Sequence, residues 1–90
     1  MSGRRFRLAE GVLAQTALEE AVLLDARVGS YFGANLSASL ILRMLIEGSD
    51  EVQILQAMRT KFDAPDAQLG ADLRQCLDDW QQRGLILALP

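Results

Sequence analysis

Residue types that perform chemistry in proteins are scarce in this chain. It contains one cysteine, Cys76, and no histidine, the side chain most often used as a general base or metal ligand. A cysteine nucleophile needs a base and a lowered thiol pKa, so the apolar neighbours of Cys76 favour a buried structural thiol. The adjacent carboxylates Asp78 and Asp79 diverge by about 100° on a helix, which favours a solvated polar face over a metal pair. The sequence therefore predicts neither catalysis nor a metal or other cofactor.

Composition and charge restrict the class of protein further. Half of the 90 residues are hydrophobic and 23% are charged, as is typical of a globular chain, and this length fits one domain over residues 1–90. Twelve acidic residues against nine basic ones give a net charge of −3, whereas binding to nucleic acid or anionic lipid normally needs a basic surface. No apolar run reaches the roughly 18–20 residues that cross a bilayer. We expect a cytoplasmic protein that binds neither nucleic acid nor membranes.

Three arginines, Arg4, Arg5 and Arg7, lie near the N-terminus. They are followed by Leu8-Ala9-Glu10-Gly11 and not by the apolar core of a signal peptide. A basic cluster at this end of a chain is most often a solvated tail. We expect the same here, with assistance in binding an acidic peptide as the alternative.

The first part of the chain, from Phe6 to Asn35, has the pattern of strands and turns. Short apolar pieces alternate with glycines there. The clearest pair is Ala21–Asp25 with Ser30–Ala34, joined by Ala26-Arg27-Val28-Gly29, because glycine readily takes the positive φ that a tight hairpin needs.

A helix is expected from Leu36 to Glu47. Asn35 or Ser37 provides its N-cap and Gly48 its end. Most positions are apolar, and the polar residues Ser39, Arg43 and Glu47 recur every four positions. This pattern predicts a largely buried helix with one thin stripe facing water.

Two more helices follow along the chain. The first runs from Asp50 to Phe62, with Asp50 and Gln53 forming a capping box. The second begins with Pro65 at its first helical position and ends at Gly84. Its apolar residues share one broad face: Leu69, Leu73, Cys76, Leu77 and Trp80. Strands followed by three helices predict a small α+β domain with a helix-turn-helix-like trio.

Several motifs occur in an order that resembles the pyrroloquinoline quinone biosynthesis protein D family. They are Leu-Leu-Asp-x-x-x-Gly-x-Tyr-Phe-x-x-Asn at 23–35, then Ile41, Leu45, Gly48, Ile54, Phe62, Asp72 and Arg83-Gly84-Leu85-Ile86. The resemblance covers residues 6–87, with departures at Ala34, Ala38 and Leu42, where the family often has Leu, Gly and Trp. It implies a winged helix-turn-helix-like fold, with an N-terminal antiparallel three-stranded sheet followed by three helices. Family members are RiPP recognition elements, which bind the leader segment of a ribosomally made precursor peptide.

The resemblance also implies where the leader binds. The peptide would add as an extra strand to the edge near Ser30–Ala34, in a groove whose other wall is the third helix; backbone groups would supply affinity and side-chain pockets specificity. Trp80 and Leu73 are also typical of a core face, so that face must be shared between core and site. Asp72 either contacts the leader or orients the groove. The candidate peptide-binding residues are Val28, Ser30, Tyr31, Phe32, Gly33, Ala34, Leu69, Asp72, Leu73, Cys76 and Trp80.

Three functions remain open on the sequence. The motif most resembles the stand-alone leader-binding proteins of lasso-peptide clusters, which implies a non-catalytic adaptor that serves a leader peptidase or another modifying enzyme. The alternative within the family is a chaperone that presents the precursor of pyrroloquinoline quinone to a radical SAM enzyme. A winged-helix DNA-binding regulator is disfavoured, because four aspartates on the third helix would face phosphate against only Arg74 and Arg83. An open strand edge also permits a homodimer.

Overall fold

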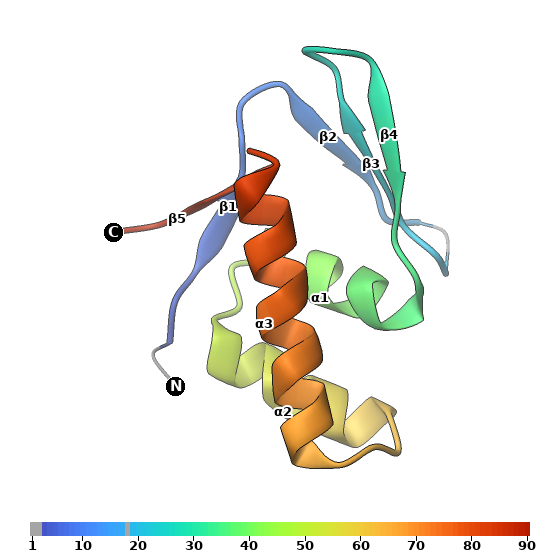
Figure 1. Cartoon of the computed structure of the whole chain (residues 1–90), viewed down its shortest axis with the longest axis vertical. Coiled ribbons are helices and arrows are strands. Elements are labelled where there is room, and N and C mark those ends of the chain that lie inside the picture. The colour runs from blue at the N-terminus through green and yellow to red at the C-terminus, as the bar shows by residue number, and fades with distance from the viewer. Residues whose placement is uncertain (1–2, 18) are drawn as a thin grey trace.

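Strands precede the three helices, as the sequence predicts, and one further strand follows them. The computed structural model describes residues 3–17 and 19–90. Its elements, shown in Figure 1, are β1 (Phe6–Leu8), β2 (Val12–Gln15), β3 (Val22–Asp25), β4 (Ser30–Gly33), α1 (Leu36–Ile46), α2 (Glu51–Lys61), α3 (Asp66–Gln82) and β5 (Ile86–Ala88). Within these residues no helix is both long and apolar enough to cross a membrane.

An antiparallel sheet of three strands, in the order β2-β3-β4, precedes the helices. The predicted hairpin is present, with Leu24 opposite Tyr31 and Asp25 opposite Ser30. Gly29 in the turn has a φ of +72°, which is the conformation that requires glycine at this point. The predicted α+β class, a three-stranded sheet followed by three helices, is confirmed.

A second sheet was not predicted from the sequence. β1 and β5 pair antiparallel, with Phe6 opposite Ala88 and Leu8 opposite Ile86. These strands of three residues come from opposite ends of the chain. A segment so short carries no clear alternation, so nothing local identified β5 as a strand.

α1 begins and ends near the predicted residues, but only part of its polar stripe faces water, with Glu47 exposed at its end. Asn35 is the N-cap, and its side-chain oxygen accepts a hydrogen bond from the Ala38 N–H. Ser39 is fully buried. Its hydroxyl accepts from the Ala21 N–H at 2.7 Å and donates to the Ala34 carbonyl at 3.1 Å. The prediction of a wet stripe is wrong at Ser39, because its hydroxyl satisfies backbone groups where the sheet meets the helix.

Arg43, on the same stripe, is also directed to the backbone. Its Nε donates to the Thr16 carbonyl at 3.1 Å, and its Nη2 donates to the Glu19 carbonyl at 2.9 Å. Ser39 and Arg43 therefore hold the β2–β3 connection and the start of β3 against α1.

The ends of α2 and α3 lie at or next to the capping residues that the sequence predicts. Asp50 and Gln53 form the predicted capping box at the start of α2. α3 begins one residue later than predicted, because Pro65 is its N-cap in an extended conformation and Asp66 is the first helical residue. Proline has no side-chain oxygen, and no side-chain cap is formed there. At the other end Gly84 has a φ of +71°, which ends α3 as predicted.

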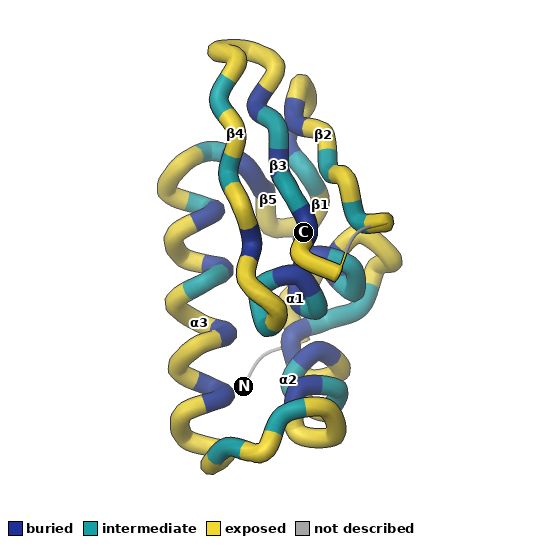
Figure 2. Tube along the Cα trace, turned by 90° about the vertical axis from the view of Figure 1, so that its right-hand side faces the viewer, coloured by how far each residue is buried: buried dark blue, intermediate teal, exposed yellow. Residues whose placement is uncertain are grey.

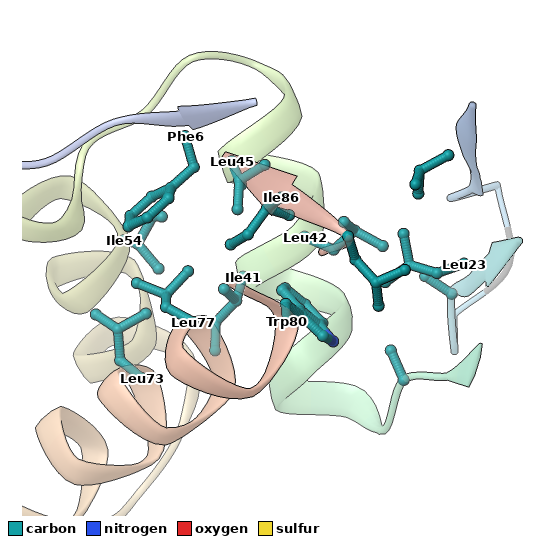
Figure 3. Close-up of a cluster of buried hydrophobic side chains, with 14 of the residues drawn as sticks. Phe6, Leu23, Ile41, Leu42, Leu45, Ile54, Leu73, Leu77, Trp80 and Ile86 are labelled. Atoms are coloured by element: carbon teal, nitrogen blue, oxygen red, sulfur yellow. The ribbon is translucent and has the colours of Figure 1, made fainter. Parts of the chain in front are cut away.

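The hydrophobic core lies where the three helices meet β5 and the inner face of the three-stranded sheet. Figure 3 shows side chains of α3 pointing towards α1 and β5. Figure 2 shows that the buried positions of α3 recur on one side of that helix. The labelled core residues are Phe6, Leu23, Ile41, Leu42, Leu45, Ile54, Leu73, Leu77, Trp80 and Ile86.

The N-terminal arginines are part of the folded structure. Arg4 Nε lies 2.5 Å from Oε1 of Glu51, a carboxylate that is only 2% exposed at the start of α2. Arg5 Nε donates to the Gly48 carbonyl at 3.1 Å. The prediction of a solvated tail is therefore wrong for these two residues, whose side chains tie the segment before β1 to the α1–α2 connection.

Candidate functional site

The outer edge of β4 carries backbone groups that point away from the sheet. The Ala34 N–H donates to the Ala21 carbonyl at 2.9 Å, so Ala34 faces β3. Inward and outward residues alternate in an antiparallel ladder, which places Phe32 and Ser30 inward as well. Tyr31 and Gly33 therefore direct their N–H and C=O groups outward. No other strand pairs with this edge within the described residues, and it is the edge from which sequence analysis expected a peptide to be bound.

The side chains of β4 lie on two different faces of the sheet. Tyr31 is 73% exposed and lies in register with Leu24 and Leu13 on the outer face. Phe32 is half-buried and packs against the core. Of the two aromatic candidates, Phe32 is thus on the side of α3, and Tyr31 is on the side away from it.

A groove of about 820 Å³ opens at the end of β4. One wall is the N-cap and first turns of α1, and the other is the outward face of α3. In the view of Figure 2, β4 is the strand of the sheet on the side of α3. The groove is lined by Asn35, Ser37, Ala38 and Ile41 from the first wall, and by Ala71, Asp72, Arg74, Gln75, Cys76, Asp78, Asp79 and Gln82 from the second.

The α3 wall of the groove is acidic. Asp72, Asp78 and Asp79 line it together with one cation, Arg74. Asp79 is paired with Arg83, whose Nε lies 3.0 Å from Oδ1. Asp78 and Asp79 both line the groove, and of the two only Asp79 is in an ion pair among the described residues. In residues 3–17 and 19–90, no group of three or more His, Cys, Asp or Glu side chains is placed to hold a metal ion.

Cys76 is a half-buried thiol in the α3 wall. Burial, together with the nearby charge of Asp79, raises the pKa of this thiol to about 12. The thiolate is the nucleophilic form of cysteine, so a thiol with this pKa is unreactive near neutral pH. The structure agrees with the prediction of a structural thiol, and it also exposes part of the side chain to the groove.

Several residues of the predicted site lie elsewhere. Leu69, Leu73 and Trp80 are buried in the core, and Leu73 has no exposed surface at all. These three residues do not line the groove, because the inward face of α3 packs on the other helices and the sheet. Val28 is 73% exposed in the β3–β4 turn, away from the groove lining.

Ser30, Tyr31, Phe32, Gly33 and Ala34 all belong to β4 or follow it directly, and Asp72 and Cys76 line the groove. Sequence analysis missed the α1 wall, above all Asn35, Ser37 and Ala38. The N-cap motif signalled where α1 starts, but only the packing of α1 beside α3 makes its first turns a wall of the groove.

Comparisons with known proteins bear on this site. None of the curated proteins compared with the chain matches it. Two solved structures are similar at a TM-score of 0.81 and 26% sequence identity. One is TbiB1 in complex with the TbiA(beta) leader peptide, with 89% of this chain and 93% of that chain covered. The other is lasso peptide synthetase B1 complexed with the leader peptide, with 96% and 99% covered.

The family comparison covers most of the chain. The model of the family described as coenzyme PQQ synthesis protein D matches residues 20–86. These residues run from just before β3 to the start of β5 and so contain the edge strand and both walls of the groove. The resemblance noted in the sequence is confirmed, and the chain belongs to the coenzyme PQQ synthesis protein D family.

Proposed function

We propose that this protein binds the leader segment of a ribosomally made precursor peptide and presents it to a modifying enzyme. The observation that carries the proposal is the free edge of β4, which leads at Asn35 into the groove between α1 and α3. Both similar structures are complexes with leader peptides. They cover nearly the whole chain, which supports the same use of this face here.

The leader adds to β4 as a fourth strand. The outward N–H and C=O groups of Tyr31 and Gly33 pair with its backbone, and this pairing does not depend on the leader sequence. Specificity comes from side chains of the leader that meet Phe32 and the groove beyond β4. A site of this size fits a binding free energy of about −8 to −9 kcal/mol, which corresponds to micromolar or high-nanomolar affinity.

β4 is the favoured edge for a geometric reason. The sheet has two edges, and β2 forms the other one. The groove begins at Asn35, separated from β4 by Ala34 alone, whereas no residue of β2 lines it. A strand bound along β4 thus continues directly into the groove. Without a leader, the same edge is free to pair with a second copy of the chain.

The role is that of an adaptor and not of a catalyst. The chain has no histidine, and the Cys76 thiol has a pKa of about 12, so neither usual nucleophile–base pair is available. The enzyme that it serves is a leader peptidase or another tailoring enzyme of lasso-peptide biosynthesis. The structural similarity to lasso peptide synthetase B1 favours this over delivery of the pyrroloquinoline quinone precursor to a radical enzyme.

Strand addition is tested by proline at Tyr31. Proline removes the outward N–H but none of the donors that face β3, and edge strands tolerate it where the lost donor faces solvent. The matched control is Tyr31→Ala, which removes the same side chain and keeps the N–H. Fluorescence anisotropy is measured with labelled leader peptides encoded beside the gene, both lasso-type and quinone-type where present, and with a DNA duplex.

We expect saturable binding of one leader, and about tenfold weaker binding by Tyr31→Pro than by Tyr31→Ala, because a hydrogen bond is lost and the ring meets the added strand. Equal affinities of the two folded variants would refute strand addition at β4. Binding of the duplex with no leader bound would refute the adaptor function altogether.

A further inference from the structure

Arg27, in the β3–β4 turn, joins three separate segments of the chain. Its Nε donates to Oδ1 of Asp25 at 2.8 Å, and its Nη2 donates to Oδ2 at 3.0 Å. The same Nη2 donates to the Gly84 carbonyl at 2.9 Å. The aliphatic part of the side chain crosses Gly11, where a Cβ atom would come within 2.9 Å of the Arg27 Cγ. The turn, the β1–β2 connection and the end of α3 thus meet at one guanidinium.

The carbonyl that Arg27 holds lies at the C-terminal end of α3. α3 has its C-cap at Arg83, and Gly84 turns the chain away with a φ of +71° towards β5. Arg83 makes a second link to the hairpin, because its guanidinium lies 5.3 Å from the centre of the Phe32 ring. The upper end of α3 is therefore held against both the turn and the edge strand of the hairpin.

These contacts are rigid by their chemistry. A guanidinium that meets both oxygens of a carboxylate is fixed in orientation as well as in distance, more so than an ammonium. The Asp25 carboxylate is itself nearly buried, and its hydrogen bond with Arg27 holds its pKa below the ordinary value. The third interaction, with Gly84, then transmits that fixed position to α3.

We propose that Arg27 is a positioning residue of the peptide site, which sets the distance between the edge strand β4 and α3 and so aligns that edge with the groove that receives the leader. The inference rests on the proposed function. Arg27 touches neither the outward edge of β4 nor the lining of the groove, so its effect on binding is indirect. The leader must pair with β4 through its backbone and contact α3 through its side chains, so binding depends on a fixed spacing between these two elements.

The test separates positioning from simple loss of stability. Arg27→Ala removes the link, and Arg4→Ala is the matched control, because it removes a comparably exposed guanidinium from a carboxylate–arginine pair that does not line the groove. Arg4→Ala leaves the buried Glu51 without its partner, so we expect the larger fall in melting temperature for the control. Leader affinity is measured for both variants and for the parent, with Arg27→Gln as a substitute should Arg27→Ala fail to fold.

The spacing is measured directly in the free protein. Spin labels at Tyr31→Cys and Gln82→Cys, in a Cys76→Ser background, report the distance from β4 to the groove face of α3. We expect Arg27→Ala to bind the leader about tenfold more weakly and to broaden this distance distribution, with Arg4→Ala changing neither. Arg27→Lys should restore binding only in part, because one ammonium group cannot bond to both Asp25 oxygens and the Gly84 carbonyl in the fixed geometry of a guanidinium.

The outcomes are distinguishable from failure of the proposed function. A parent protein that binds no leader would refute that function itself. If the parent binds, unchanged affinity in Arg27→Ala overturns the positioning role, whatever the distance shows. Weaker binding with an unchanged distance overturns it too, because the loss would then have another cause. Equal losses of affinity in Arg27→Ala and Arg4→Ala would show that the weaker binding comes from lower stability, and would overturn the positioning role.

Discussion

The guanidinium of Arg83 lies 5.3 Å from the centre of the Phe32 ring, which brings the end of α3 into contact with the edge strand β4. Arg83 also pairs with Asp79 one turn earlier on the same helix. One side chain therefore covers the inward aromatic of the edge strand and neutralises a carboxylate of the groove. This arrangement has consequences for both stability and binding.

Replacement of Arg83 by alanine should lower the free energy of unfolding by about 1 kcal/mol. An exposed cation–π contact contributes about 0.5–1 kcal/mol and an i,i+4 ion pair about 0.3–0.5 kcal/mol. Urea denaturation measures the change. Arg74→Ala, on the exposed side of the same helix, is the control and should stay within about 0.5 kcal/mol of the parent. Equal effects of the two substitutions would show that the Phe32 contact contributes nothing.

Leu73 and Gln75 should separate the core of α3 from its groove face. Leu73→Ala leaves a cavity at a site with no exposed surface and should cost about 2–5 kcal/mol of unfolding free energy. Gln75 lines the groove, and Gln75→Ala should change stability by less than about 0.5 kcal/mol. Urea denaturation and leader titration at a temperature where both variants are folded provide the measurements. If Leu73→Ala kept the stability of the parent protein but bound the leader more weakly, Leu73 would belong to the binding site and not to the core.

The acidic wall of the groove should favour leaders with a basic residue where they cross α3. Asp72 lines this wall, and no ion pair of its carboxylate occurs among the described residues. Asp72→Asn should weaken binding of such a leader about two- to fivefold, the range of an exposed ion pair. The loss should shrink as salt is added. Asp63→Asn, outside the groove, is the charge-matched control. If both variants bind equally well at low salt, Asp72 only borders the site.

The Cys76 thiol should react slowly with alkylating reagents. Its pKa of about 12 lies well above the ordinary value of about 8.5. At pH 8 the folded protein should therefore be alkylated about a thousandfold more slowly than the chain unfolded in urea, as followed by mass spectrometry. The sign for stability follows from the same shift. The thiol ionises at a lower pH in the unfolded chain than in the folded protein. Burial of the neutral thiol therefore contributes fully to stability below about pH 8.5, and this contribution decreases as the pH rises towards 12. Cys76→Ala should lack this part of the pH dependence.

The buried hydroxyl of Ser39 should make a larger contribution to the free energy of unfolding than its small size indicates. It satisfies the Ala21 N–H and the Ala34 carbonyl at once. Ser39→Ala leaves both backbone groups unpaired and should cost about 1–3 kcal/mol of unfolding free energy. Ser37→Ala, near the start of the same helix, is the control for helix propensity and solvent exposure. A cost below about 0.5 kcal/mol for Ser39→Ala would mean that water replaces the hydroxyl.

Local chemistry explains the parts of the fold that were predictable from the sequence. Gly29 marks the hairpin turn, because few other residues take its backbone conformation. Asn35, Asp50 and Gln53 mark the helix starts, because their side chains bond to backbone groups within three residues. The same is true of the family motifs, whose order along the chain was sufficient to identify the family that the comparison confirms.

Burial and long-range pairing depended on the tertiary structure. The spacing of Ser39 along α1 is that of a solvent-facing residue. It is buried because the backbone at Ala21 and Ala34 packs on it and forms hydrogen bonds with its hydroxyl. Leu73 and Cys76 are both on the broad apolar face of α3, yet the first faces the core and the second reaches the groove. Helical periodicity shows which residues share a side of a helix, but it does not show which other element covers that side.

By itself, the sequence determined the β3–β4 hairpin, the three helices with their approximate ends, and the family, because these depend on interactions between near neighbours in the chain. The tertiary structure alone decided that β5 pairs with β1, that the first turns of α1 form a wall of the groove, and that Arg27 reaches Gly84. Each of these joins residues far apart in the chain, so their distance is set only when the core has packed.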